Sequence, residues 1–381
     1  MPRHVLASAL LSALFLAQLA GCASDSQSNC SDPARAAGCS AETKTVVAPP
    51  GRAASKTLTS GAQFSPRDSM AAVDFGHYLW VLGGFTPERT NEVWYSADGL
   101  TWTQAATPPW SPRNLASAAV LDGRMFLLGG YGHDGDAPAY FNDVYATVDG
   151  QSWETVATHA PWGPRAAFGL VAHAGFLYVI GGNGPNGSYN DVWRSADGAN
   201  WELVSAAAPW AARGMFAAVS FRDRVWVIGG GVYDDAYVYN VRQNFNDVWS
   251  SPDGVQWTRE MDDAAFSPRR FFSAFVHQDT LFVSSGFELD RRIFEDQRDG
   301  LRKADLDADQ QAFYDLTRGR VYGNLNDFWA STDGRSWRSV VVDYPFAPRH
   351  AVSALPLSDY VFFIGGFGEE LYNDVWTFQF Y

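Results

Sequence analysis

The stretch NDVWRSADGANW, residues 190–201, sets two tryptophans on either side of an Asp-Gly pair. Near-copies of the whole stretch begin at residues 91, 142, 246 and 326. A sixth copy, NDVW at 373–376, stands just before residue 381 and lacks the Asp-Gly part. A phrase that recurs about every 50 residues indicates a chain built from one supersecondary unit used repeatedly.

Every unit has the same internal order. A segment ending in arginine is followed by a run of small residues, an apolar run that closes on two glycines, and the NDVW phrase. The small residues predict a first strand packed close to a central axis. An apolar run on consecutive positions predicts a second strand that is covered on both faces. The NDVW phrase predicts a third strand, the Asp-Gly pair a hairpin turn, and the final tryptophan the start of a fourth strand.

Two local features complete the unit. We expect the double glycine to let the chain turn sharply after the second strand, because glycine tolerates backbone angles that a side chain forbids. In the fifth unit this place reads SSG, residues 284–286. The Ser or Thr two residues before the Asp of each turn is expected to hydrogen-bond the turn's own backbone.

An arginine and the acid of the NDVW phrase occur in all six units, which predicts a structural role. The arginines are Arg67, Arg113, Arg165, Arg213, Arg269 and Arg349. The acids are Glu92, Asp143, Asp191, Asp247, Asp327 and Asp374. A partly buried arginine most often finds a carboxylate, so we expect the two sets to be paired. A ring of arginines that binds an anion is the open alternative.

A double glycine followed by a tryptophan, at a period of about 50, resembles the kelch repeat over about residues 55–381. The resemblance implies an all-β fold, a six-bladed kelch-type β-propeller with four-stranded antiparallel blades. The sixth unit lacks a fourth strand, so an N-terminal strand near residues 55–60 is expected to complete blade six and close the ring. The turn also resembles the Asp-box of sialidases, and we interpret it as structural.

Features that differ between the units are candidates for a binding site. The residue after the repeated arginine varies and reads Asp68, Asn114, Ala166, Gly214, Arg270 and His350. In kelch domains this position faces the mouth of the channel, together with the loops between strands two and three. We expect such loops at 131–141, 183–189, 231–245 and 367–372. Their tyrosines, expected to crowd one rim, are Tyr131, Tyr140, Tyr189, Tyr233, Tyr237, Tyr239 and Tyr372.

These positions give a predicted ligand site. Its residues are Arg270, His350, Asp68, Asn114, Tyr131, Tyr233, Tyr237, Arg291 and Arg292. Tyrosines offer flat faces to a sugar or a peptide, and carboxylates accept hydrogen bonds from hydroxyls or amines. Arg291 and Arg292 begin an insertion, about 287–324, that is expected to bring cations over the mouth. Loops that pack only on one another are the alternative.

The same insertion carries three alternating aspartates, Asp305, Asp307 and Asp309. This spacing suggests a calcium loop, but Gln310 stands where an EF-hand loop has its glycine, and no glutamate follows at the twelfth place. We therefore favour the start of a short helix, where acidic residues are stabilising.

The first 21 residues predict a secretory signal peptide, because a charged start precedes a short apolar run. The run ends in LAGC, which resembles the lipobox of bacterial lipoproteins and implies acylation of Cys22. An ordinary signal peptide is the alternative. Residues 22–54 read as a flexible polar tether, and its Cys30 and Cys39 could form a small disulfide loop. The expected location is the bacterial cell envelope, lipid-anchored, with the outer membrane or periplasm favoured.

Composition narrows the functional classes. The net charge of −14 argues against binding to nucleic acid. Galactose oxidases share the kelch propeller, but their cross-linked Cys–Tyr copper site cannot form because no cysteine follows Cys39. No histidine pair has metal-ligand spacing, so we predict neither a metal nor a cofactor.

The favoured function is a non-catalytic module, acting as a monomer, that binds a glycan or protein partner at the channel mouth and touches the membrane only through its anchor. The alternative is a periplasmic enzyme similar to the N-acetylneuraminate epimerases, which mutarotate sialic acid on such a propeller.

The anchor can be tested directly. We expect Cys22→Ser to move the protein from the membrane fraction to the soluble fraction, because the acylated thiol would be lost. Fractionation followed by immunoblotting would measure this. Unchanged fractionation of the variant would contradict the anchor.

Overall fold

The computed structural model of the protein describes residues 48–233, 241–288 and 323–381. Several predicted features lie outside these residues: the signal peptide, Cys22, Cys30 and Cys39, the acidic run at 305–309, Tyr237, Arg291 and Arg292. Tyr233 ends a strand, but its side chain is not among those described. Among the described residues, no helix is long and apolar enough to cross a membrane.

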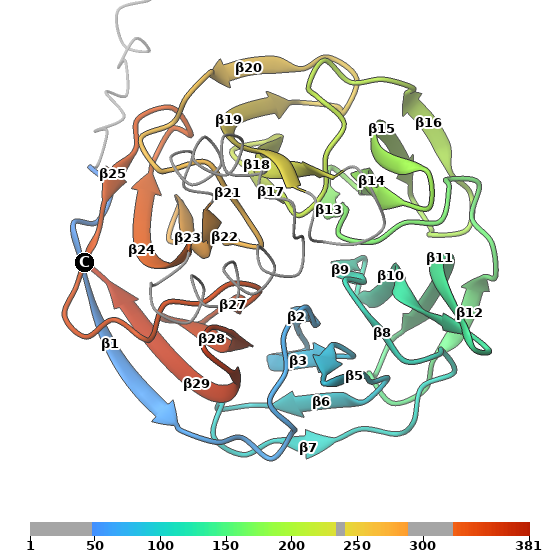
Figure 1. Ribbon diagram of the computed structural model, residues 1–381, viewed down its shortest axis with the longest axis horizontal. Coiled ribbons are helices and arrows are strands. Elements are labelled where there is room, and N and C mark those ends of the chain that lie inside the picture. Colours follow the sequence, from blue (N-terminus) through green and yellow to red (C-terminus); the bar gives the residue numbers. More distant parts are fainter. Residues whose placement is uncertain (1–47, 234–240, 289–322) are drawn as a thin grey trace, which may run out of the picture. The chain divides into compact units, whose positions relative to one another are not determined.

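Six antiparallel sheets stand around a common centre, as predicted for a six-bladed propeller (Figure 1). The innermost strands are β2 (Ala71–Phe75), β9 (Ser117–Leu121), β13 (Gly169–His173), β17 (Ala217–Phe221), β22 (Ser273–His277) and β27 (Ser353–Leu357). Each innermost strand contacts the next, and β27 contacts β2, so the ring is closed. The blades are numbered one to six in this order.

The other strands of each blade follow outward in sequence order. The second strands are β3 (Tyr78–Leu82), β10 (Arg124–Asp134), β14 (Phe176–Gly184), β18 (Arg224–Tyr233), β23 (Thr280–Glu288) and β28 (Tyr360–Phe367). The third strands are β6 (Val93–Ser96), β11 (Ala137–Thr147), β15 (Gly187–Ser195), β19 (Val241–Ser251), β24 (Asn324–Ser331) and β29 (Leu371–Phe380). The fourth strands are β7 (Thr103–Gln104), β12 (Glu154–Ala157), β16 (Glu202–Ser205), β20 (Thr258–Met261), β25 (Arg338–Ser339) and β1 (Arg52–Thr59). Short additional strands are β4 (Phe85–Thr86), β5 (Glu88–Arg89), β8 (Arg113–Asn114), β21 (Arg269–Arg270) and β26 (Val341–Val342).

Blade six is completed by the N-terminal strand, as predicted. Strand β1 pairs antiparallel with β29, from Ala53 opposite Phe380 to Thr59 opposite Val375. It begins at Arg52, inside the segment expected to be tether. Strand β1 also pairs in parallel with β26, which follows the last strand of blade five. One strand thus joins both ends of the chain and two blades, and it covers the edge that β29 would otherwise expose.

The double glycine does not turn the chain sharply, as we expected, but forms a bulge inside a strand. In blade two, β10 continues to Asp134, and its pairing with β11 shifts between Leu128 and Gly130. Gly130 has φ of 106°, and a Cβ there would lie 2.9 Å from the Cβ of Ala116. The glycines therefore permit a close approach to the innermost segment. Only in blade one does the second strand end before the pair.

The Asp-Gly turns are held as predicted. In blade three, Ser195 Oγ accepts a hydrogen bond from the Gly198 N–H at 2.9 Å, and Asp197 Oδ1 accepts from the Ala199 and Asn200 N–H groups. These donors, led by the Asn200 N–H, lower the pKa of Asp197 to about 2. Trp201 Nε1 donates to the Gly198 carbonyl at 2.8 Å. The repeated carboxylate of each Asp-Gly turn therefore organises the local backbone.

The repeated arginines pair with the repeated acids, which excludes the anion-binding ring. Arg113 is 2% exposed and forms two hydrogen bonds with Asp143, at 2.6 and 2.9 Å. Its Nη1 also donates to the Gly129 carbonyl, and its Nε donates to the Ser111 carbonyl. The same pattern recurs in the other blades, although Arg67 makes a single bond to Glu92. Each guanidinium is buried and its donors are occupied within its own blade.

The backbone of the same arginine bonds to the preceding blade. The Arg113 N–H donates to the Thr90 carbonyl at 3.1 Å, and the Arg113 carbonyl accepts from the Gly84 N–H at 2.9 Å. The asparagine of the NDVW phrase adds a further link between blades. Asn190 Nδ2, for example, donates to the Ala208 and Trp210 carbonyls on the way to blade four. The repeated arginine and the asparagine of the NDVW phrase therefore form the contacts that join one blade to the next.

Deleting residues 52–59 should destabilise the whole propeller. Blade six would lose its outer strand and expose Phe378, which is fully buried. We expect the Tm to fall by about 10 °C or more, because each kcal/mol shifts the Tm of a large domain by about 2–4 °C. Deleting residues 23–47 is the matched control and should leave the Tm nearly unchanged. Equal Tm values for the two truncations in calorimetry would refute the closure by β1.

Candidate functional site

The variable positions meet at one end of the channel, where we define the mouth ring as six bridged pairs. The residue after each repeated arginine bridges the residue after the glycine pair of its own blade. The pairs are Asp68 with Phe85, Asn114 with Tyr131, Ala166 with Asn183, Gly214 with Gly231, Arg270 with Phe287, and His350 with Phe367. The structure thus brings together the predicted Asp68, Asn114, Tyr131, Arg270 and His350. Their role in binding remains a prediction.

A second, inner ring lies next to the first, and we call it the collar. It consists of the residue two places after each arginine: Ser69, Leu115, Ala167, Met215, Phe271 and Ala351. All six have a backbone φ between 50° and 55°. Residues other than glycine rarely adopt this left-handed conformation. The N–H of Leu115 donates to the Ser69 carbonyl at 2.8 Å, and the same bond is repeated from blade to blade as far as Ala351. These inter-blade bonds offset the cost of the strained conformation.

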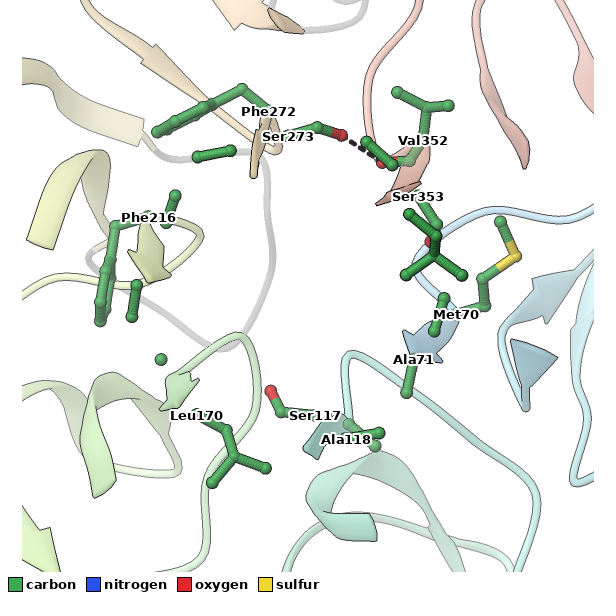
Figure 2. Close-up of a pocket in the computed structure, with 18 of the residues that line it drawn as sticks. Met70, Ala71, Ser117, Ala118, Leu170, Phe216, Phe272, Ser273, Val352 and Ser353 are labelled. Atoms are coloured by element: carbon green, nitrogen blue, oxygen red, sulfur yellow. Dashed lines mark hydrogen bonds between the residues drawn. The ribbon is translucent and has the colours of Figure 1, made fainter. Parts of the chain in front are cut away.

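The collar separates the mouth from the channel. Met215 is 7% exposed and packs against Leu115, Ala167 and Phe271 from three other blades. Just beyond the collar begins a cavity of about 290 Å³, lined by the first strands. Figure 2 shows its labelled lining residues, among them Ala71, Ser117 and Ser273, around an open centre. A ligand at the mouth would therefore rest on the apolar collar side chains.

Arg270 lies between blades four and five. The side chain is buried, and its Nη1 donates to Asn244 Oδ1 of blade four at 3.4 Å. The guanidinium carbon stands 4.7 Å from the centre of the Phe287 ring. An aromatic face beside the cation stabilises the positive charge of Arg270.

His350 occupies the equivalent place between blades five and six. Its Nδ1 is 2.7 Å from Asn324 Oδ1, and its ring lies 5.3–5.6 Å from those of Phe271, Phe287 and Phe367. Burial lowers the pKa of His350 to about 3, and the charge of Arg270 acts in the same direction. The imidazole is therefore neutral near pH 7. Because the amide oxygen can only accept, Nδ1 carries the proton and Nε2 is the hydrogen-bond acceptor.

A third polar contact lies between blades one and two. Arg89 Nε donates to Asn114 Oδ1 at 3.1 Å, and the Arg89 guanidinium carbon stands 4.4 Å from the centre of the Tyr131 ring. Tyr140 lies beside Tyr131, with ring centres 4.9 Å apart. Arg89 was not predicted, because it sits on the short β4–β5 hairpin found in blade one and follows no repeated pattern.

Asp68 differs from the other ionisable members of the mouth ring. Burial raises the pKa of Asp68 to about 6, and its contact with Ser69 opposes this rise only in part. No ion pair joins Asp68 to any cation in the described part of the chain. A carboxyl group with this pKa can exchange a proton near neutral pH.

Two of the predicted rim tyrosines belong to the scaffold instead. The Tyr189 ring centre stands 4.3 Å from the guanidinium carbon of Arg165, and Tyr372 lies 3.9 Å from that of Arg349. Phe141 and Phe245 cover Arg113 and Arg213 in the same way. The segments expected to be rim loops are largely hairpins that extend strands two and three. An aromatic residue directly before the asparagine of the phrase was the sequence signal for this role.

The mouth ring is uneven. In blades three and four it consists of Ala166, Asn183, Gly214 and Gly231, which leaves little side chain over the collar. In blades five, six, one and two it carries aromatic and ionisable side chains. Among residues 48–233, 241–288 and 323–381, no three His, Cys, Asp or Glu side chains gather as metal ligands do.

Comparisons with known proteins agree with this architecture. Residues 41–230 match the model of the KLHDC2/KLHL20/DRC7 Kelch-repeats domain. The N-acetylneuraminate epimerases of Escherichia coli (strain K12) and Shigella flexneri are each 34% identical to the chain over 100 residues. Those alignments cover 25% of this chain and 27% of each relative, so the chain matches about a quarter of their length. A solved structure titled "Structure of YjhT" superposes with a TM-score of 0.62 over 83% of this chain and 94% of that chain, at 17% identity, which shows the shared fold.

The pKa of His350 predicts how the fold responds to acid. The pKa of the His350 imidazole is 6.5 in the unfolded chain, its ordinary value, and about 3 in the folded protein. Its contribution to stability is therefore complete above pH 6.5 and is lost as the pH falls toward 3. We expect His350→Gln to lose less stability than the wild type between pH 6.5 and 4, measured as Tm.

Asp68 is the control, because its effect on stability changes with pH in the direction opposite to that of His350. Its pKa is raised from 3.8 to about 6, so its contribution is present below pH 3.8 and is lost as the pH rises through 6. Asp68→Asn should therefore make the acid-side loss of Tm steeper than in the wild type. Identical pH profiles for the wild type and His350→Gln would contradict the placement of His350.

Proposed function

We propose that this kelch-repeat six-bladed propeller, related to bacterial N-acetylneuraminate epimerases over a quarter of its length, binds a carboxylated sugar at its mouth ring. The observation that carries the proposal is the group on blades five and six: the buried guanidinium of Arg270 beside the neutral imidazole of His350, among phenylalanine rings. The relatives' name supplies the substrate class, a sugar acid.

Each part of this group suits one part of such a ligand. Arg270 places a permanent positive charge at the mouth, which attracts the carboxylate of such a sugar. Its low-dielectric surroundings strengthen that attraction. His350 Nε2 accepts a hydrogen bond from a hydroxyl, and the Phe367 and Phe287 rings offer flat apolar faces to the C–H groups of a pyranose.

Interconversion of the two anomers of the sugar is the second candidate. It is favoured by the name of the relatives, which are epimerases, and by the Asp68 carboxyl of the mouth ring, whose pKa is raised to about 6. Proton transfer to and from an anomeric hydroxyl needs a group that accepts a proton at neutral pH. A purely binding role predicts that the protein leaves the rate of mutarotation unchanged, and proton NMR of freshly dissolved N-acetylneuraminate distinguishes the two.

The location and the remaining contacts are also proposals. Acylation of Cys22 would hold the propeller at the cell envelope, with the mouth ring free to bind soluble or surface glycans. Tyr233, Tyr237, Arg291 and Arg292 are proposed to approach the same mouth from blades four and five. A protein partner is the alternative occupant, and failure of every sugar acid in a binding panel would favour it.

Replacement of Arg270 tests the binding site. We expect Arg270→Gln to weaken N-acetylneuraminate binding at least about tenfold in calorimetry, because the positive charge that attracts the carboxylate is lost. The Tm of the variant, measured alongside, reports whether it keeps the fold. Arg222→Gln is the matched control: Arg222 is a half-exposed arginine of blade four that lies outside the mouth ring and pairs with Asp279 of blade five at 2.9 Å. Unchanged binding by Arg270→Gln would remove Arg270 from the site.

A further inference from the structure

Arg89 brings a positive charge to the mouth ring between blades one and two, on the opposite side of the ring from Arg270. It stands on the β4–β5 hairpin of blade one. Its Nε donates to Asn114 Oδ1 at 3.1 Å, and its guanidinium carbon lies 4.4 Å from the centre of the Tyr131 ring. These contacts use the Nε donor of the guanidinium but not its two terminal amino groups, Nη1 and Nη2.

The two terminal amino groups of Arg89 have no partner in the described part of the chain. No carboxylate there forms an ion pair with Arg89, and neither Nη1 nor Nη2 donates a hydrogen bond. The repeated arginines, by contrast, are bound to the acids of their own blades. Neither Nη atom is among the buried side-chain atoms that lack a hydrogen-bond partner, so both amino groups are open to solvent. Arg89 therefore presents an accessible cation that the protein itself does not neutralise.

Two neutral hydrogen-bond donors lie beside this cation. Because a guanidinium can only donate, the amide oxygen of Asn114 faces Arg89, and the Asn114 Nδ2 group is left as a donor. The Tyr131 hydroxyl is the second donor. Among the described residues neither group makes a hydrogen bond, and neither atom is buried, so both are open to solvent.

The backbone holds these three side chains in place before any ligand binds. Asn114 and Tyr131 face each other as one bridged pair of the mouth ring. Thr90, the residue after Arg89, donates its N–H to the Gly84 carbonyl at 3.0 Å and accepts from the Arg113 N–H at 3.1 Å. The segments that carry Arg89 and Asn114 are therefore bonded to each other, and little ordering remains for a ligand to impose.

The chemistry of these groups selects a planar anion with a single charge. Each of the three side chains can donate a hydrogen bond, so an ammonium group would find no acceptor on Arg89 or on Asn114 Nδ2. A guanidinium matches a carboxylate through two parallel hydrogen bonds. A doubly charged phosphate fits less well, because one cation stands in a chain of net charge −14, with Glu88 next to it.

We infer that Arg89, Asn114 and Tyr131 form a subsite for the carboxylate of a sugar acid between blades one and two. The Asn114 amide and the Tyr131 hydroxyl suit the hydroxyls of the sugar, and Tyr140, whose ring centre lies 4.9 Å from that of Tyr131, adds aromatic surface. The inference shares its class of ligand with the proposed function but does not rest on it, because it uses neither Arg270 nor His350.

A matched pair of ligands isolates the contribution of the carboxylate. The p-nitrophenyl β-glucuronide and β-glucoside differ only in a carboxylate in place of a hydroxymethyl group. Titrations followed by NMR of the ligand give the Kd of each sugar for the wild type and for Arg89→Gln. We expect the wild type to bind the glucuronide about tenfold more tightly than the glucoside, because charge-assisted hydrogen bonds form only with the carboxylate. In Arg89→Gln the two Kd values should lie within about twofold of each other.

Two further variants complete the experiment. Arg89→Lys keeps the charge but not the planar pair of donors, so it should retain a preference of only about threefold for the glucuronide. Arg259→Gln is the matched control, since Arg259 also lies over an aromatic ring, that of Trp249 at 5.5 Å, but on β20, outside the mouth ring. It should keep the full preference. The Tm of each variant reports whether it folds.

Three results would overturn the subsite. A wild type that binds the two sugars equally, or binds neither, has no carboxylate site at Arg89. A full preference in Arg89→Gln would place the carboxylate elsewhere. A full preference in Arg89→Lys would mean that only the charge acts, without the paired hydrogen bonds. The proposed function is tested by N-acetylneuraminate and Arg270→Gln, so either proposal can fail without the other.

Discussion

One arginine in each blade holds the propeller together, and the other features of the structure depend on it. Its side chain is buried against the acid and the glycine carbonyl of its own blade, while its backbone bonds to the blade before. A single residue therefore fixes both the packing within a blade and the angle to its neighbour. Removing one partner of such a buried pair costs about 3–5 kcal/mol, because a charge is left without compensation. The tryptophan after the acid, such as Trp193, donates to the same carboxylate and stabilises its position.

This constraint explains why variation gathers at the mouth. The backbone of the residue after each arginine is placed by the bridge to its own blade and by the collar, whatever its side chain. The left-handed residues of the collar cost about 1 kcal/mol or more each, and the repeated inter-blade bonds sustain them. A position with a fixed backbone and a free choice of side chain can acquire a function without loss of the fold. Ala166 and Gly214 at one side of the ring, and Arg270 and His350 at the other, are the result.

The side chains of the mouth ring differ in size and charge from one side of the mouth to the other. Blades three and four contribute little more than backbone, whereas blades five, six and one contribute a guanidinium, an imidazole and a carboxyl in succession. The pKa values of the last two move in opposite directions, since burial favours the neutral form of each. Charge and polarity therefore change from one side of the mouth to the other.

The sequence alone determined the number of blades, the strand order, the Asp-Gly turns, the Arg–Asp pairing and closure by the N-terminal strand. Each of these follows from local patterns of about 50 residues, which repetition makes unambiguous. It also pointed to Asp68, Asn114, Tyr131, Arg270 and His350 as variable positions on one rim. Only the tertiary structure decided what those residues touch. The roles of Asn244 and Asn324 as partners, of Tyr189 and Tyr372 as covers for buried arginines, and of Arg89 beside Tyr131 depend on which side chains of adjacent blades meet. The sequence could not predict these contacts, because they join residues that lie far apart in the chain.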